Sequence, residues 1–179
     1  AIRLWPAVVI VVLMLGAILG PSYVVPATFT QFLAMFYGPM IGGLAIALWL
    51  WFASRAAFAD KLLATLTLAA GWLAMIPLVH PSTRLALLLY GLPTALTLLV
   101  VGLWGGRSPL SAGRRVLLAV MIFLGWGYFT LIRIDGTTGA LQSARAWRWE
   151  PSAEDRYVAS LSKSAPAAAA PDAAANAAT

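Results

Sequence analysis

Apolar residues fill most of the first 132 positions, and the ionisable side chains there are confined to short breaks between five apolar stretches. From Leu4 to Ser54 there is no Asp, Glu, Lys, Arg or His, so a helix in this stretch has no polar face to present to water. A helix needs about 20 apolar residues to cross about 30 Å of hydrocarbon. The pattern therefore predicts an all-α integral membrane protein, a bundle of five transmembrane helices at residues 4–19, 29–53, 62–79, 85–104 and 116–132.

Turn-forming and capping residues mark the expected limits of these spans. Gly20, Pro21 and Pro26 are expected to break the first helix, and Thr28 to Gln31 has the spacing of a capping box that begins the second. Polar residues that can cap the other three helices precede or begin them: Asp60, then Ser82 or Thr83, then Ser111. Prolines inside the second and fourth spans predict kinks there: Pro39 and Pro93.

The first span has a basic residue before it, an apolar run and small residues near its end, as a secretory signal sequence does. It has no convincing cleavage site. We therefore expect a retained membrane helix that further residues precede.

Positive charge is distributed unequally between the two sides of the membrane that these spans define. The two loops on the side opposite the N-terminus hold only Arg84. The segments on the side of the N-terminus hold Arg3, Arg55, Lys61, Arg107, Arg114 and Arg115. Because basic residues favour the cytoplasmic side, we expect a cytoplasmic N-terminus, and an odd number of spans then puts the C-terminus in the periplasm of a bacterium. Tryptophans favour the interface at the same cytoplasmic end: Trp5, Trp49, Trp51 and Trp104. The predicted location is a bacterial inner or intracytoplasmic membrane.

The composition of the chain and the positions of its charged residues exclude several kinds of function. The chain carries 12 Lys and Arg against 6 Asp and Glu, but the basic residues lie at span ends and along the C-terminal segment, not on one face that would bind nucleic acid. Without cysteine it forms no disulfide, thiol or iron–sulfur site. Transport and proton pumping need ionisable groups at membrane depth, and Asp135, Glu150 and Asp155 all lie outside the spans. We therefore expect no enzyme activity, no catalytic or metal-binding residue and no intrinsic cofactor.

A few side chains are candidates for ligand contact. His80 is the only histidine; it is a candidate metal or chlorophyll ligand, with an interfacial hydrogen-bonding role as the alternative. Trp72, Trp126 and Tyr128 lie within spans, where they pack against neighbouring helices and lipid or stack on a quinone or pigment. Membrane lipids are the expected partners of the spans.

Small-residue spacing suits close helix packing in three spans. G-x-x-x-G pairs, which let two helix backbones approach closely, occur at Gly16 and Gly20, Gly38 and Gly42, and Gly102 and Gly106. We expect the face from Gly38 to Gly43 to pack against another helix, of this chain or of a partner.

The segment that leaves the last span contains two motifs. Residues 131–136 read Leu-Ile-Arg-Ile-Asp-Gly, and residues 146–151 read Ala-Trp-Arg-Trp-Glu-Pro, followed by Glu-Asp-Arg at 154–156. They resemble the exit from the membrane region of bacterial PQQ-like (pyrroloquinoline quinone type) β-propeller proteins, which has Arg-Thr-Asp-Gly, a glycine-rich spacer, Ala-Trp-Arg-Trp and an acidic stretch. Arg-Leu-Trp-Pro at residues 3–6 and Ser-Arg-Ala at 54–56 are also similar, so the resemblance extends to residue 161.

The resemblance implies spans that tether a periplasmic propeller, and any PQQ-dependent dehydrogenase activity would belong to that propeller. After Leu161 the chain departs from the pattern, because it continues as Ala-rich low complexity with no propeller repeat. No catalytic residue is carried over from the family. The chain thus divides into a membrane region (1–132), a periplasmic segment that is interfacial or docks (133–161), and an Ala/Pro-rich tail or linker (162–179).

The sequence leaves two hypotheses for the function. In the first, the chain is a non-catalytic accessory or scaffold subunit that packs against other integral membrane subunits of a larger complex, for which a photosynthetic or respiratory assembly is a natural host. In the second, it is the membrane anchor of a PQQ-like propeller protein. The accessory subunit would dock through residues of types enriched at interface hot spots: Arg145, Trp147, Arg148 and Trp149. The same residues also suit a strip that lies on the membrane surface.

Overall fold

The computed structural model describes residues 3–104, 109–137 and 143–168 and has five helical segments long and apolar enough to cross a membrane. Three of them correspond to α1 (Trp5–Val24), α2 (Phe29–Leu48) with the π-helix η1 (Trp49–Ala53), and α3 (Phe58–Met75). The fourth is composite: η2 (Pro81–Thr83), α4 (Arg84–Ala86), η3 (Leu87–Gly91) and α5 (Leu92–Leu103). The fifth is α6 (Ala112–Gly127) with η4 (Tyr128–Thr130). The prediction of five helices long and apolar enough to span a membrane is confirmed.

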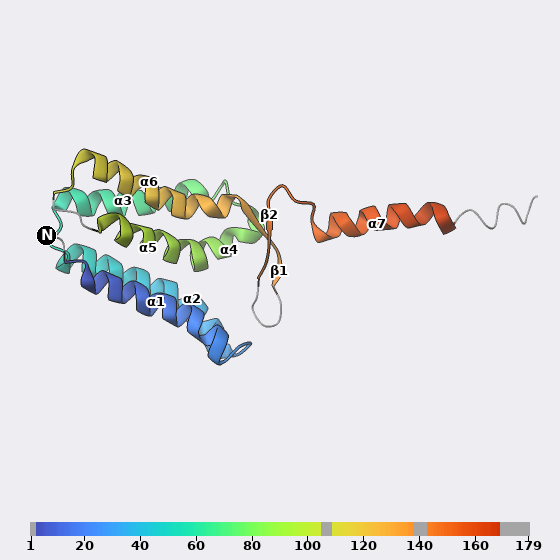
Figure 1. The fold of residues 1–179 in the computed structure, drawn as a ribbon, viewed down its shortest axis with the longest axis horizontal. Coiled ribbons are helices and arrows are strands. Elements are labelled where there is room, and N and C mark those ends of the chain that lie inside the picture. Colours follow the sequence, from blue (N-terminus) through green and yellow to red (C-terminus); the bar gives the residue numbers. More distant parts are fainter. Residues whose placement is uncertain (1–2, 105–108, 138–142, 169–179) are drawn as a thin grey trace, which may run out of the picture. The chain divides into compact units, whose positions relative to one another are not determined.

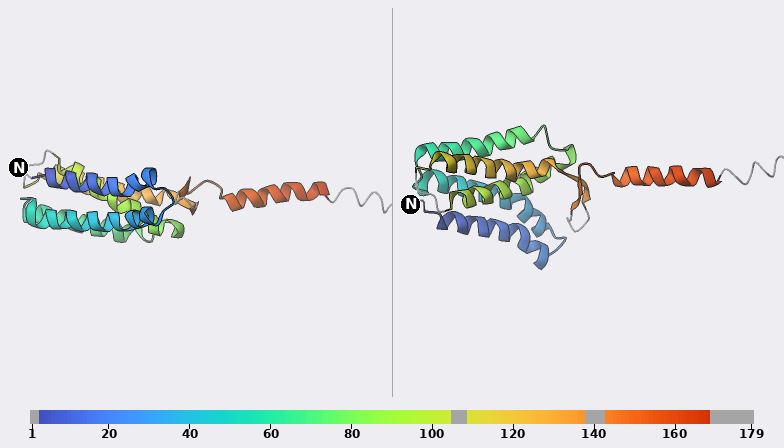
Figure 2. Two further views of the ribbon diagram at one scale, coloured as in Figure 1. Left: turned by 90° about the horizontal axis from the view of Figure 1, so that it is seen from below. Right: turned by 45° about the horizontal axis from the view of Figure 1, so that its top comes forward.

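Residues 1–148 form one compact unit in which successive spans run antiparallel (Figure 1). We call the two ends of this bundle the N-terminal end and the hairpin end. Helix α5 lies centrally, packed against α1, α2 and α6 (Figure 2). Half of the residues of the fourth span are buried (50%), against 22–28% in the other four, so the other helices turn most of their apolar surface outward. Such outward apolar surface suits a lipid solvent.

The first helix is longer than predicted. Pro21 lies inside α1, which continues to Val24, so the expected break at Gly20 and Pro21 is wrong. A proline removes one backbone donor but sets a helical φ, and only one further turn follows it before the helix ends. The chain then turns at Ala27, which has a positive φ of 59°.

Capping residues act as the sequence predicted at α2 but not at α3. Thr28 Oγ1 accepts the backbone N–H of Gln31, and the Gln31 side chain accepts from Ala27 instead of Thr28. Helix α3 begins after Ala57 without a side-chain cap, so Asp60 is the third residue of the helix and the prediction that it caps α3 is wrong. Ser111 precedes α6 as expected but forms no side-chain cap hydrogen bond.

The start of the fourth span is capped by His80, which replaces the predicted caps Ser82 and Thr83. Nδ1 of His80 accepts the backbone N–H of Ser82, and Thr83 has no capping side-chain bond. The π-helix η3 ends two residues before Pro93, whose ring would clash with the carbonyl of Leu89 in a regular helix. The expected distortion at Pro93 is therefore a wide turn of helix just before it.

After the fifth span the chain forms a two-stranded antiparallel sheet of β1 (Ile132–Thr137) and β2 (Ser143–Trp147), with a bulge between Ile134 and Gly136. Thr83 Oγ1 donates to the carbonyl of Ile132, which ties β1 to the hairpin end of the bundle. Residues 149–179 form a second unit, of which the structure describes α7 (Ala153–Ala168). We expected an extended segment to residue 161 and a low-complexity tail beyond it, whereas α7 is helical and crosses that boundary.

Candidate functional site

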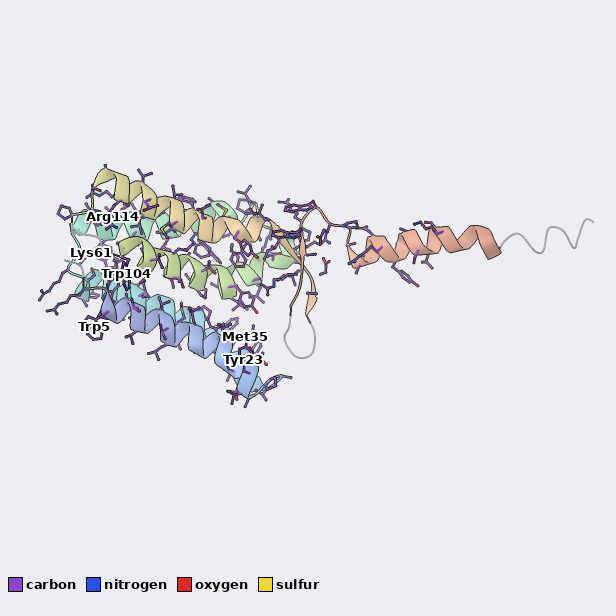
Figure 3. The ribbon with its side chains drawn as sticks, in the orientation of Figure 1. Trp5, Tyr23, Met35, Lys61, Trp104 and Arg114 are labelled. Atoms are coloured by element: carbon purple, nitrogen blue, oxygen red, sulfur yellow. The ribbon has the colours of Figure 1, made fainter. Side chains whose placement is uncertain are left out.

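A cavity of about 720 Å³ opens at the hairpin end, between α1 and α2 on one side and residues of η3, α5, η4 and the hairpin on the other. We call it the hairpin-end cavity. Tyr23 and Met35, at the hairpin ends of α1 and α2, line it (Figure 3). Its apolar wall includes Leu15, Ile18, Leu19, Leu89, Pro93, Phe129 and Ile132. Its polar groups come from Ser22, Gln31, Tyr90, Thr94, Tyr128 and Arg145.

The hairpin supplies one charged residue to this cavity. Ile134 lies opposite Arg145 across the two strands, and opposed residues of an antiparallel pair project from the same face. Both residues, with Ile132, line the cavity. Apart from tyrosine, Arg145 is the only ionisable residue among the lining groups, and its side chain has no hydrogen bond or ion pair within the described residues. The neighbouring carboxylate, Asp135, is already bound by Nε of Arg133 at 2.5 Å.

On the opposite side of the cavity, polar side chains of α1 and α2 bond to one another. Gln31 is 3% exposed, and its amide nitrogen donates to Oγ of Ser22 at 3.2 Å. Its amide oxygen accepts the backbone N–H of Ala27 at 2.7 Å. This pair of bonds holds the turn between α1 and α2 and leaves the Ser22 hydroxyl with a proton to donate.

A second cavity, of about 320 Å³, lies nearer the middle of the bundle and is lined by Trp51, Trp72, Trp126 and aliphatic residues. The rings of Trp72 and Trp126 meet edge to face at 5.4 Å. Trp126 is 1% exposed, and its indole N–H has no acceptor within the part of the chain that the structure describes. That N–H edge lies against Gly71, where an added Cβ would be 3.0 Å from Nε1. Trp72 and Trp126 thus pack together beside an apolar cavity, and stacking on a quinone or pigment stays a prediction.

The predicted glycine pairs differ in their surroundings. An added Cβ at Gly42 would clash with Met14 of α1, and one at Gly102 would be 2.7 Å from Cδ1 of Leu118 in α6. Gly38 faces Ile18 of α1, and Gly43 faces Leu92 and Leu96. Added Cβ atoms at Gly16 and Gly20 would meet nothing within 4 Å. Gly106 lies outside the described residues.

The predicted docking residues do not form one cluster. Arg148 is bound to the bundle: its backbone N–H donates to Leu131, and its Nη1 donates to the carbonyl of Leu78 at 3.1 Å. Trp147 is opposite Ile132 and 41% exposed, Arg145 lines the hairpin-end cavity, and Trp149 belongs to the second unit.

His80 has local partners only. Its Nδ1 lies 2.9 Å from Oγ of Ser82, in addition to the backbone bond that caps η2. Among the described residues, no three His, Cys, Asp or Glu side chains group closely enough to hold a metal ion. The bonds of His80 to Ser82 are of the kind that the interfacial hydrogen-bonding alternative expects, and a role as metal or chlorophyll ligand stays a prediction.

Sequence reasoning missed an ion pair at the N-terminal end. Asp60, 1% exposed, accepts from the backbone N–H of Leu110 at 2.9 Å and from Nε of Arg115 at 3.0 Å. It therefore joins α3 to the start of α6. Two other cations there bind carbonyls at helix ends, Lys61 at Trp51 and Arg114 at Trp104 (Figure 3). The signal in the sequence was an acidic residue just before an apolar span, but its partners lie 50 and 55 residues away.

Comparison of the chain with protein-family models, with curated proteins and with solved structures gives no match. The part of the chain that the structure describes is a bundle with five helical segments long and apolar enough to cross a membrane, followed by a two-stranded hairpin.

Proposed function

We propose that this protein is a non-catalytic subunit of a larger membrane assembly and that it contacts a neighbouring membrane protein through one face of α1. That face, which we call the outer face of α1, consists of Val9, Leu13, Gly16 and Gly20. The opposite face of the helix is buried against the bundle: Ala7, Val11, Met14 and Ile18.

The observation that carries the proposal is the glycine pair on this outer face. Gly16 is exposed, and an added Cβ at Gly16 or Gly20 would meet nothing within 4 Å among the residues that the structure describes. Glycine lowers helix propensity by about 1 kcal/mol relative to alanine, and helices in lipid use small residues mainly where another helix approaches. Inside the bundle, Gly42 and Gly102 each allow a neighbouring helix to approach closely. The glycine pair on the outer face of α1 therefore favours a similar approach by a helix of another protein.

The test is to replace Gly16 and Gly20 together with leucine and to follow the chain after mild detergent extraction from its native membrane. We expect the wild-type chain to migrate in an assembly well above its own 19.0 kDa, and the variant to migrate alone. The matched control replaces Gly113 and Gly127 with leucine, because added Cβ atoms there also meet nothing within 4 Å. A wild-type chain that migrates alone, or a Gly16/Gly20 variant that stays in the assembly, would contradict the proposal.

A second candidate function is the membrane anchor of a PQQ-like propeller protein. It is favoured by the pairing of the two motifs that carry the resemblance: Arg133 lies opposite Ala146, and the backbone of Arg148 donates to Leu131. The hairpin that they form marks the point at which such a propeller would leave the membrane region. The intact mass of the polypeptide in its native membrane separates the two functions, since an anchor would be tens of kilodaltons heavier than these residues.

A further inference from the structure

The hairpin-end cavity has the chemistry of a site for an amphipathic molecule. Its wall is apolar from Leu15 to Leu19 on α1 and at Phe129 beyond α6. Its polar groups gather near the hairpin: Ser22 is in the last turns of α1, Gln31 begins α2, and Arg145 is on β2. A volume of about 720 Å³ lies within the roughly 300–1,000 Å³ typical of ligand sites.

We infer that the hairpin-end cavity binds one anionic phospholipid, with an acyl chain along the apolar wall and the phosphate at the guanidinium of Arg145. This inference goes beyond the proposed subunit role and does not depend on it. The charge of the cavity selects the occupant, because its lining, among the residues that the structure describes, holds one cation and no carboxylate. A guanidinium binds phosphate oxygens through paired, charge-assisted N–H donors, which makes Arg145 suited to an anionic headgroup.

Polar groups of the cavity complete the headgroup site. The Ser22 hydroxyl accepts from Gln31, which leaves its proton for an ester or phosphate oxygen. The Tyr90 and Tyr128 side chains line the cavity from the opposite side and have no hydrogen-bond acceptor for their hydroxyls among the described residues. Free inorganic phosphate would use Arg145 but leave the apolar wall uncovered, so the wall favours a lipid.

The experiment titrates the purified, delipidated chain with phosphatidylglycerol or with phosphatidylcholine of the same acyl chains, and counts bound lipids by native mass spectrometry. We expect one phosphatidylglycerol to bind at lower concentration than phosphatidylcholine. Arg145→Gln should weaken phosphatidylglycerol binding about fivefold, the effect of one cation near an anionic headgroup, and leave phosphatidylcholine binding unchanged. Arg84→Gln, which removes a charge at the same end but outside the cavity, should change neither.

A second pair of variants tests the apolar wall. Met35→Trp fills the cavity and should abolish binding of the single tight lipid, whereas Met40→Trp, on the exposed side of the same helix, should retain it. Circular dichroism of each variant shows whether the bundle is folded. Equal losses in Arg145→Gln and Arg84→Gln would overturn the inference, as would lipid binding that persists in a folded Met35→Trp variant. A neutral isoprenoid quinone that binds in the cavity in place of phosphatidylglycerol, or phosphate that binds alone, would also overturn it.

Discussion

Gly71 leaves room for the indole of Trp126, which is 1% exposed and has its other edge close to Gly91. An added Cβ at Gly71 would lie 2.5 Å from Cδ1 of Trp126. We expect Gly71→Ala to destabilise the bundle by about 1–3 kcal/mol, the usual effect of adding a methyl group where a buried ring is already in contact. Unfolding of the detergent-solubilised chain by SDS, followed by tryptophan fluorescence, measures this change.

Gly127→Ala is the matched control at the residue scale, because an added Cβ there meets nothing within 4 Å. Alanine is the better helix former by up to about 1 kcal/mol, so this variant should unfold at the same or a higher SDS fraction than the wild type. Equal stability of Gly71→Ala and Gly127→Ala would show that Trp126 has space to move and would contradict the packing described here.

At the scale of elements, one carboxylate holds the N-terminal ends of α3 and α6 together. Asp60→Asn keeps a side-chain oxygen for the Leu110 N–H but loses the charge that pairs with Arg115. Breaking a fully buried pair destabilises by about 3–5 kcal/mol, and we expect about 2 kcal/mol here because the Arg115 side chain is 37% exposed. Asp135→Asn, whose pair with Arg133 lies within one strand and joins no two helices, should cost less than Asp60→Asn in the same SDS unfolding assay. An equal effect of the two substitutions would contradict the role of Asp60 as a tie between helices.

Helices and caps could be predicted from the sequence where they depend on residues that lie close together along the chain. The five spans follow from hydropathy alone, and the cap at α2 follows from Thr28 and Gln31, three residues apart. The role of Asp60 depends on residues far along the chain, so its position suggested a cap of its own helix. Helix α7 had a local signal that was overlooked: Ser152 and Asp155 form a capping box before an alanine-rich run.

Only part of the candidate site could be predicted from the sequence, again because its contacts join residues that lie far apart along the chain. Arg145 stood out as a residue of an interface-forming type, but its place over a cavity depends on its register opposite Ile134. The polar pair of Ser22 and Gln31 forms because α1 continues past Pro21, which the sequence predicted as a break. Likewise, the different surroundings of Gly16 and Gly42 depend on which helix faces each of them, and residue spacing alone does not determine that.

At the scale of the whole molecule, the distribution of cations predicts the orientation of the bundle. Arg3, Arg55, Lys61, Arg114 and Arg115 all belong to the N-terminal end, and Lys61 and Arg114 bind carbonyls at the ends of other helices there. Moving these fixed charges across a bilayer is unfavourable, and basic segments stay on the cytoplasmic side. We therefore expect the N-terminal end to face the cytoplasm and the residues after β2 to face the periplasm.

Cysteine labelling tests this orientation without background, because the chain has no native cysteine. Single cysteines at the exposed positions Ser111 and Ala153, as Ser111→Cys and Ala153→Cys, report on the N-terminal end and on the start of α7. In intact cells with a permeable outer membrane, a membrane-impermeant maleimide should label Ala153→Cys and leave Ser111→Cys unlabelled until the inner membrane is disrupted. The reverse pattern would place the basic end outside, and labelling of both positions in intact cells would mean that the bundle has no single orientation. Only the expected pattern puts the hairpin, Trp147 and the mouth of the hairpin-end cavity at the periplasmic surface, where partners and lipids of that leaflet reach them.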